Sequence, residues 1–397
     1  VSTRRIFDTV LEAAGLPGGD GGLLKVRPEV VLGEALKPFL QYGWQPQVMA
    51  LEGRLKAIRS GGLEVYDLEA DPQELHDLAG TADLSRELRA ALKDYPIAPR
   101  VGAAAGDEHL SLEDRQRLAS LGYAGGQGRA PARDDAPPPK DMTHLFASLD
   151  RGSALFVQEK YGEAARVFEA IEGKDPGNLM VKLRLAVANS ALGRGQRALA
   201  YFEEARKLDP SSVDVRHYLA MHYLANGDPA NAAPLFEAVL AQDPDRLPAL
   251  AGLARIRAEQ GDLRRAASLE ERIVALEAKP APHLVKLGEL RMGMGDTPAA
   301  IRAFEEAQAL EGEKFDHFLE LGVCYQAAGR YADAGEALDR VPPAHPGYAM
   351  ALFKRAQVSV LLGEPDASRR IQRALLDSNE LTRELIHNEA LFETLAH

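Results

Sequence analysis

Glycines recur every 34 residues through the second half of this chain, and this spacing constrains the fold more than any other feature. The six positions are Gly193, Gly227, Gly261, Gly295, Gly329 and Gly363. Alanine follows five residues after each of the first five glycines, and serine after the sixth. A period of this length predicts repeated pairs of helices, each pair packing on its neighbours.

The repeated residues each have a mechanical role in a helical hairpin. Glycine ends the first helix because the chain needs a left-handed backbone angle there, which glycine adopts freely. Small residues such as Ala186 and Gly288, seven positions before the glycine, let the two helices cross closely. An aromatic or leucine nine positions after it, such as Phe202, fills the gap between hairpins. Proline at the end of the unit, such as Pro210, then prevents the second helix from continuing.

This pattern resembles the tetratricopeptide repeat (TPR) family. In that frame seven repeats cover 145–382, within an array predicted over 142–382, and residues 383–397 form an amphipathic capping helix. The first repeat departs from the pattern with Glu159 in the glycine position, the fourth has Glu270 in the aromatic position, and the last is also irregular. The predicted fold is mainly α: an α-solenoid of about seven helical hairpins, preceded by a small α+β domain with an antiparallel sheet.

The fifth, ninth and twelfth positions of each first helix share one face, which in TPR proteins lines a concave groove. Candidate groove residues are Leu183, Val187, His217, Met221, Leu224, Arg255, Glu289, Met292, Leu319 and Val323. The set is largely apolar. It lacks the combination of Lys, Arg and Asn residues with which some TPR proteins clamp a peptide carboxylate. The resemblance implies a protein or peptide partner with an apolar segment. In the alternative, neighbouring helices cover this face, and burial above about nine-tenths would then exclude a groove.

Composition excludes several other functions. The formal net charge of −12 gives the chain as a whole no attraction for nucleic acid or anionic lipid. The single cysteine, Cys324, permits neither an internal disulfide nor a thiolate metal cluster, and a buried structural thiol is expected there. His217 and His222 are five residues apart on a predicted helix, so they do not converge on a metal. No apolar run approaches the roughly 20 residues that span a bilayer.

Residues 1–126 have a different pattern. Three short strands are predicted, Gln47–Leu51, Leu55–Arg59 and Leu63–Leu68, and their glycine turns favour an antiparallel meander. Helices are predicted over Arg4–Leu16, Glu74–Ala79, Asp83–Tyr95 and Ser111–Gly122. Residues 127–141 are rich in Gly and Pro and predict a linker that is flexible at first and stiffer at its proline run.

Four strings in this region, taken in order, resemble the C-terminal part of sulfatase-like hydrolases of the alkaline phosphatase superfamily. They are IFDTVLEAAGLP at 6–17, YGWQPQVMALEGRLKAIR at 42–59, LEVYDLEADPQELHDLA at 63–79 and LASLGYAGG at 118–126. The match includes Lys56 and Ile58 of a K-x-I string and Val65–Leu68 followed by Asp71-Pro72. The family has a proline directly before the threonine of the first string, and here Asp8 precedes Thr9 instead. In the third string, His76-Asp77-Leu78 stands where the family has Asn-Leu.

The resemblance implies a parent enzyme whose catalytic core lies upstream of Val1, a position where a helical pattern begins almost at once. In that family the nucleophile, in a C-x-P-S-R or S-x-P-S-R string, and the ligands of a divalent cation precede the matched region. This chain has neither string, so we expect it to be inactive alone and to hold no cofactor. The parent would hydrolyse sulfuric, phosphoric or phosphonic esters, would be exported or periplasmic, and would contact these repeats. In the alternative, the chain is a free-standing TPR scaffold with a non-catalytic remnant.

Overall fold

The structure is a computed structural model that describes residues 30–35, 37–95, 135–367 and 369–370. It divides into two units, Val1–His222 and Tyr223–His397, and each is described by itself. Some predicted elements lie outside the described residues: the helices Arg4–Leu16 and Ser111–Gly122, the linker up to residue 134, and the capping helix 383–397.

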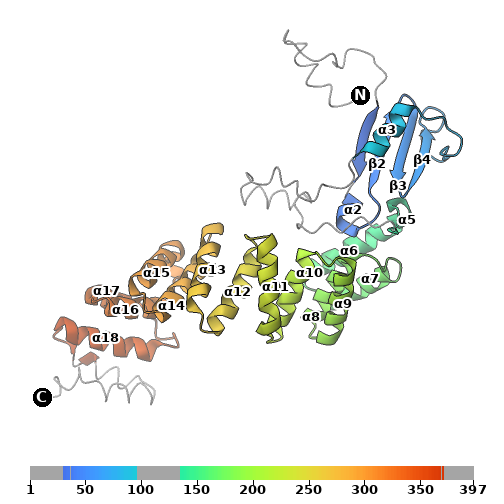
Figure 1. The fold of residues 1–397 in the computed structure, drawn as a ribbon. Coiled ribbons are helices and arrows are strands. Elements are labelled where there is room, and N and C mark those ends of the chain that lie inside the picture. The colour runs from blue at the N-terminus through green and yellow to red at the C-terminus, as the bar shows by residue number, and fades with distance from the viewer. Residues whose placement is uncertain (1–29, 36, 96–134, 368, 371–397) are drawn as a thin grey trace, which may run out of the picture. The chain divides into compact units, whose positions relative to one another are not determined.

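The first unit contains a four-stranded antiparallel sheet (Figure 1). Its strands are β1 (Val31–Ala35), β2 (Gln47–Glu52), β3 (Leu55–Ser60) and β4 (Gly62–Asp67), which pair in that order. Gly53 and Gly61 supply the left-handed turns between them, with φ of 58° and 73°. The three predicted strands and their antiparallel order are therefore confirmed, whereas β1, whose sequence VLGEA has little alternation, was not predicted.

One face of this sheet is covered by helix α3 (Arg86–Asp94), as Figure 1 shows. Strand residues Val48, Ala50, Ala57 and Val65 are buried on that face against Leu84, Leu88 and Leu92. The helix begins where the Ser85 hydroxyl accepts a hydrogen bond from the Leu88 amide at 2.9 Å. The helix predicted over Asp83–Tyr95 is therefore present, and its cap places the start three residues later.

The helix predicted over Glu74–Ala79 is wrong. The Asp71 carboxylate accepts the His76 amide at 2.7 Å, and the Asp77 carboxylate accepts the amides of Val65 and Ala79. The Leu78 amide also donates to the Val65 carbonyl, so the segment lies along the open edge of β4. Short acidic side chains that bind nearby amides compete with helix formation, and they do so here.

A short helix that was not predicted, α2 (Lys37–Tyr42), lies between β1 and β2, and its end reaches the core of the first repeat. Trp44 is buried, and its indole Nε1 donates a 2.7 Å hydrogen bond to the Asp175 carboxylate at the end of the first hairpin. Tyr42 and Phe146 pack against the Trp44 ring, with centroids 4.8 Å and 5.5 Å away. Trp44 thus joins the core of the first repeat.

The end of the predicted linker is also structured. The Pro137 carbonyl accepts a hydrogen bond from the Gln45 amide at 2.9 Å. Helix α5 (Pro139–Met142) and the 3₁₀ turn η2 (Thr143–Leu145) follow directly, and Met142 and Leu145 are buried in the core of the first repeat. Contact with the sheet region, which a linker composition does not reveal, orders this stretch.

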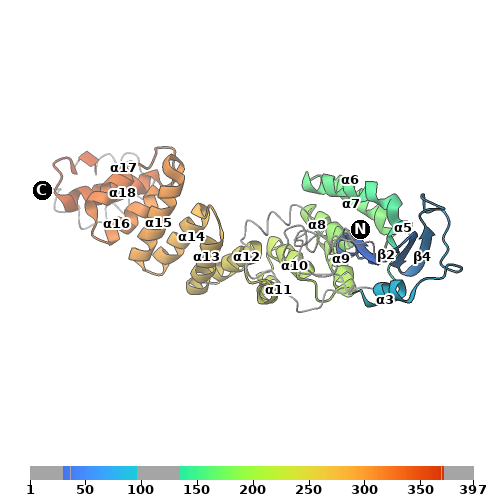
Figure 2. The same ribbon diagram turned by 90° about the horizontal axis from the view of Figure 1, so that it is seen from above.

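The first unit continues with two hairpins and most of a further helix (Figure 2). The helices are α6 (Phe146–Val157), α7 (Tyr161–Glu172), α8 (Leu179–Ala191), α9 (Gly195–Leu208) and α10 (Val213–Ala225), which runs into the second unit. Gly193 turns the α8/α9 hairpin with φ of 71°. Glu159 makes the same turn between α6 and α7 with φ of 59°, so the irregular first repeat keeps the backbone geometry without the glycine.

The second unit contains the last residues of α10, helix α11, three described hairpins and helix α18 (Figure 1). Its elements after α10 are α11 (Pro229–Gln242), α12 (Leu247–Glu259), α13 (Leu263–Leu276), α14 (Ala281–Gly293), α15 (Thr297–Glu311), η3 (Gly312–Lys314), α16 (Phe318–Ala327), α17 (Tyr331–Asp339) and α18 (Tyr348–Leu362). Each remaining glycine of the 34-residue series has a φ between 66° and 79°. The predicted solenoid of helical hairpins is confirmed for the described residues.

Close packing inside a hairpin follows one rule. A Cβ added to Gly288 would lie 2.8 Å from ring carbons of Phe304, and one added to Gly322 would lie 2.7 Å from Leu338. A small residue on the first helix therefore receives the large one on the second. Phe236 also reaches the next hairpin, since a Cβ on Gly252 would lie 2.6 Å from its ring. The large side chain fills both the crossing and the gap between hairpins.

The fourth repeat has a polar residue at the position where the neighbouring repeats have a large apolar side chain on the second helix. Glu270 is buried there, and its carboxylate lies 2.6 Å from Nδ1 of His283 on α14. Glu277 lies farther from the other ring nitrogen, at 3.8 Å. A buried polar pair thus replaces aromatic packing, and the hydrogen bond offsets part of the cost of burying the carboxylate.

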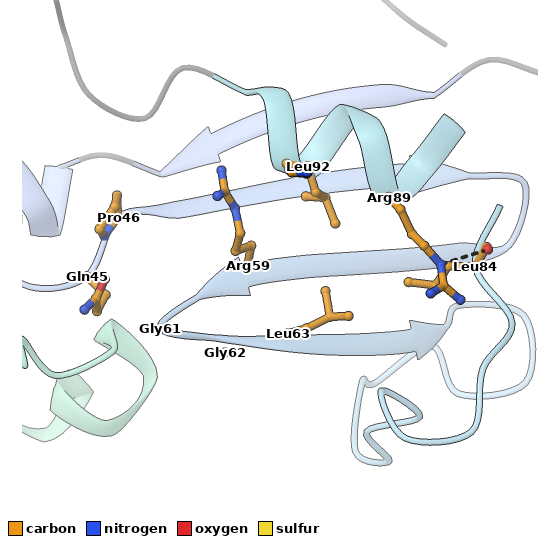
Figure 3. A pocket seen from close by; sticks show the side chains of 10 residues that line it. Gln45, Pro46, Arg59, Gly61, Gly62, Leu63, Leu84, Arg89 and Leu92 are labelled. Atoms are coloured by element: carbon orange, nitrogen blue, oxygen red, sulfur yellow. Dashed lines mark hydrogen bonds between the residues drawn. The ribbon is translucent and has the colours of Figure 1, made fainter. Parts of the chain in front are cut away.

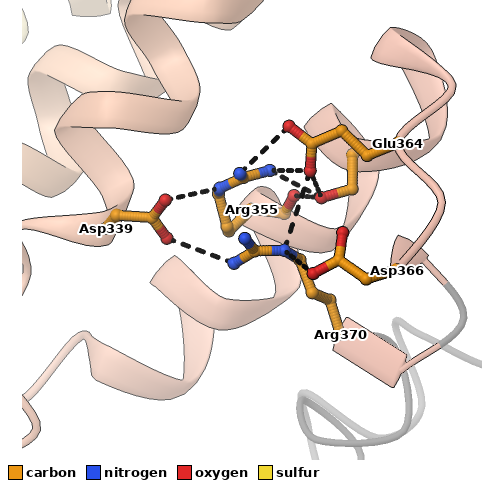
Figure 4. Close-up of polar contacts among 6 residues, drawn as sticks. Asp339, Arg355, Glu364, Asp366 and Arg370 are labelled. Carbon is orange, nitrogen blue, oxygen red and sulfur yellow. Dashed lines mark hydrogen bonds and ion pairs between the residues drawn. The ribbon is translucent and has the colours of Figure 1, made fainter.

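A group of charged side chains joins the end of α18 to α17 (Figure 4). Arg355, largely buried on α18, contacts Asp339 at 3.0 Å and Glu364 at 2.9 Å. Desolvation opposes its charge, yet these carboxylates keep the pKa of Arg355 above its usual value. Arg370 lies 3.4 Å from Asp339 and 3.2 Å from Asp366. The seventh repeat is therefore attached partly by ion pairs.

Candidate peptide-binding surface of the repeats

The candidate groove residues lie on the first helices of the hairpins, at positions that share one face of each helix. We call this set the first-helix stripe. In the first unit it comprises Leu183 and Val187 on α8 and His217 and Met221 on α10. Leu183 and Val187 are half-buried against the core, and His217 is buried beside the Tyr218 ring. Met221 is 40% exposed, so it is the apolar side chain that this part of the stripe offers to a partner.

In the second unit the stripe comprises Leu224, Arg255, Glu289, Met292, Leu319 and Val323. Leu224 is buried, and Leu319 and Val323 on α16 are half-buried. The exposed members are Arg255, Glu289 and Met292, the last at 37%. The exposed part is thus more polar than the whole set, because its most apolar members pack on their neighbours.

Glu289 and Met292 are three residues apart on α14, so they are neighbours on its surface. Glu289 is exposed, yet surrounding protein atoms desolvate its carboxyl and raise its pKa. Glu320 raises this pKa further, while His317 and Lys286 lower it.

Two contacts along these helices were not predicted. The Gln326 side chain on α16 donates a 3.2 Å hydrogen bond to the buried Gln357 on α18. In the first unit, the Ser190 hydroxyl lies 2.7 Å from Nδ1 of His222. Burial lowers the pKa of His222, which favours the neutral imidazole in this contact. Both contacts join consecutive first helices, and sequence periodicity does not indicate which polar pairs will meet.

The other chemically distinctive residues have structural surroundings. Cys324 is buried as predicted, and burial, followed by the nearby Glu320, raises the pKa of its thiol to about 11. The thiol is therefore protonated and poorly nucleophilic at neutral pH. Within the described ranges, no group of three or more His, Cys, Asp or Glu side chains could hold a metal ion. No helix among those residues is long and apolar enough to cross a membrane.

Family models match the repeats directly. Two tetratricopeptide repeat models match the chain, one over residues 223–287 and the other over 149–213 and again over 285–349. The second model matches in two places separated by four periods of the glycine series. This chain contains tetratricopeptide repeats. TPR arrays are protein-interaction modules, so the matched residues indicate a protein partner.

Several solved structures, two of them of TPR proteins, are similar to part of the chain. The C-terminal part of a TPR protein from Cytophaga hutchinsonii is 16% identical, with a TM-score of 0.48, and covers 59% of this chain and 98% of that one. A TPR protein from Parabacteroides merdae is 15% identical, with a TM-score of 0.41, and covers 63% and 98%. PilF of Pseudomonas aeruginosa is 17% identical, with a TM-score of 0.40, and covers 55% and 96%. No curated protein matches the chain.

Proposed function

We propose that the TPR hairpins of this chain bind a partner protein along the first-helix stripe, and that the partner presents an apolar segment. The exposure of Met221 in the first unit and of Met292 in the second carries the proposal. Methionine is flexible and polarisable, and it adapts to apolar side chains of different shapes. Arg255 and Glu289 in the second unit add charges that would select the polar flank of the partner segment.

The test is capture of partner proteins by the full chain from an extract of its own cells, with three variants compared. Met221→Glu and Met292→Glu each place a charge on the stripe, and both side chains are exposed enough for the fold to tolerate it. Leu310→Glu is the matched control, because Leu310 is 55% exposed on α15, a second helix. Leu224 is unsuitable because it is buried, and a charge there would test folding instead of binding.

We expect the same protein to be retained by the chain and by Leu310→Glu, and to be lost from at least one stripe variant. Loss of one buried anchor at the centre of an interface costs about 2 kcal/mol or more, which is more than tenfold in affinity. Retention by both stripe variants would show that the partner binds another surface of the repeats.

We further propose that residues 30–95 belong to the C-terminal subdomain of a sulfatase-like hydrolase, to which the repeats are appended. The ordered strings at 42–59 and 63–79 support this, since they include the strand pair β2 and β3 and the strand β4 followed by Asp71-Pro72. The reading frame upstream of Val1 tests it. A catalytic domain with a C-x-P-S-R or S-x-P-S-R string would support the proposal, and a start codon close to Val1 would contradict it.

A further inference from the structure

A cavity of about 520 Å³ opens on the sheet of the first unit, beside α3 and over the strands β3 and β4 (Figure 3). Among the described residues, its lining includes three cationic ones, Arg59, Arg89 and Lys93, and no carboxylate. The whole chain has a net charge of −12, so a purely basic lining departs from the average surface. Ligand sites commonly have volumes of roughly 300–1,000 Å³.

Arg59 occupies a position that the sheet pattern reserves for an apolar side chain. It pairs with Val48 on β2 and with Leu63 on β4, and two residues before it on the same face Ala57 is buried. Its Nε atom is buried without a hydrogen-bond partner among the described residues. One terminal nitrogen reaches the Tyr95 carbonyl at 3.5 Å, the outer limit of a hydrogen bond. A buried Nε–H donor without an acceptor costs free energy, and an anion bound in the cavity would remove this cost by accepting the hydrogen bond.

Helix α3 adds two more cations. Arg89 and Lys93 are four residues apart, and like charges at this spacing destabilise a helix by a few tenths of a kcal/mol. Arg89 donates from Nε to the Leu84 carbonyl at 3.2 Å. Arg89 also forms an ion pair with Asp83 at 3.6 Å. Because the Asp83 carboxylate is fully exposed, this ion pair is weak. These charges have no strong stabilising partner in the lining of the cavity.

The same cavity has an apolar side. Leu84 and Leu92 are buried where they line it, and Leu63 projects from β4 with 42% of its surface exposed. Figure 3 shows Leu63 on the strand opposite Arg59, with Leu92 on the helix above. The mouth is bordered by Gly61 and Gly62, which carry no side chain to close it. An apolar floor beside three cations suits a ligand with both characters.

From this geometry we infer a binding site for a small organic anion: an acidic group, which is a carboxylate, sulfate or phosphate, attached to an apolar body. Arg59 would hold the acidic group by charge-assisted hydrogen bonds, and Lys93, in the last turn of α3, would add a point charge at the rim. Arg89 lies toward the other end of the cavity, as Figure 3 shows, and would not contact this group. The apolar body would cover Leu63, Leu84 and Leu92. The site is independent of partner binding by the repeats, since none of its lining residues lies on the first-helix stripe.

The probes are naphthyl phosphate, naphthyl sulfate and naphthoate, titrated into the full chain by calorimetry. Naphthol and inorganic phosphate serve as the apolar body and the acidic group alone. We expect at least one of the three anions to bind at least tenfold more tightly than either fragment, and to weaken with added salt because the site is partly exposed. The best of the three identifies the acidic group.

Variants assign the binding to this cavity. Arg59→Gln should weaken the best anion about tenfold or more, since a hydrogen bond to a charged group contributes roughly 1.5–3 kcal/mol. Lys93→Gln should weaken it about twofold or more, because it removes one nearby positive charge. Arg54→Gln is the matched control: Arg54 is an exposed arginine beside the same sheet, paired with Asp67 at 3.1 Å and outside the lining. Lys93 is exposed, so its variant tests binding even if Arg59→Gln fails to fold.

Three results would overturn the inference. In the first, none of the three anions binds to the unaltered chain. In the second, naphthol binds as tightly as the anions, which would indicate an apolar site without charge recognition. In the third, Lys93→Gln leaves the affinity unchanged or Arg54→Gln lowers it equally, which would place the anion outside this cavity.

Discussion

In the hairpins α14/α15 and α16/α17 the same contacts recur: a glycine with positive φ at the turn, and a glycine on the first helix under a large apolar side chain on the second. In the sheet region, residues 30–95, each stabilising contact occurs once. The Ser85 cap, the Asp77 bonds along β4 and the Trp44–Asp175 hydrogen bond have no repeated counterpart. Recurring contacts leave a period in the sequence, whereas single contacts leave only isolated residues.

This difference has an energetic consequence. In a solenoid each hairpin contacts its neighbours, so the loss of one contact affects a limited part of the stack. The sheet region is attached to the first hairpin through Trp44 and its immediate neighbours, so the loss of one polar contact there affects the attachment of the region. Four experiments test this contrast, in order of decreasing expected effect.

Phe304→Ala should cause the largest loss. Phe304 is fully buried against Gly288, and truncating such a ring commonly costs about 3–5 kcal/mol because a cavity remains. Urea unfolding followed by circular dichroism measures the change. Leu310→Ala on the same helix is the control, because Leu310 is largely exposed and its loss should change stability by less than about 0.5 kcal/mol. Equal effects of the two variants would contradict the role of the recurring ring.

Asp175→Ala should release the sheet region from the first hairpin. It removes the acceptor of the Trp44 indole and of the Asn178 side chain, and a buried donor left unpaired costs about 1–3 kcal/mol. Trp44 is the single tryptophan of the chain, so its fluorescence reports this contact. We expect its emission to shift to longer wavelength at a lower urea concentration than in the unaltered chain.

Asp243→Ala is the control for that experiment, since it removes an aspartate at the same repeat position in the second unit. It should leave the Trp44 transition unchanged. A Trp44 transition that moves equally in both variants would show that the indole contact is not specific to Asp175.

Acid should weaken the attachment of α18. The hydrogen bond from Arg355, with support from Ser359, holds the pKa of Glu364 below its usual value despite partial desolvation. A carboxylate with a lowered folded pKa stabilises above its unfolded pKa, and the contribution is lost as pH falls through the folded value. Glu364→Gln should therefore cost about 1–2 kcal/mol at neutral pH and progressively less below about pH 4.5. Urea unfolding across this range measures the difference, and a cost independent of pH would contradict the ion pair.

Substitutions at two turn residues should change stability least, and the two changes should have opposite signs. Gly193→Ala should cost about 1–2 kcal/mol, because alanine is strained at positive φ although a Cβ there meets no atom within 4 Å. Glu159→Gly should stabilise the first hairpin by up to about 1 kcal/mol, because it removes the same strain. Thermal unfolding of the two variants checks this. A destabilised Glu159→Gly would show that the Glu159 side chain compensates for its backbone.

Much of the molecule could be predicted from local patterns. The glycine spacing predicts the turns, and period-two alternation with glycine turns predicts β2, β3 and β4. The helix predicted at Glu74–Ala79 fails because the competing acceptors, Asp71 and Asp77, act through amides whose position depends on the folded edge of β4. The stripe could be placed on the first helices, but its exposure could not, since that depends on how closely neighbouring helices approach.

The sequence by itself determined the repeat, its helical hairpins and their turns, because these depend on backbone angles and on residue size at fixed spacing. The tertiary structure decided which unique contacts form. Trp44 meets Asp175 across 131 residues, and the packing of α3 on the sheet brings Arg59 and Lys93 to one cavity. Such contacts have no period, because each depends on where two separately folded segments come to lie. The candidate anion site arises from contacts of this kind, whereas the candidate protein-binding surface follows from the repeat.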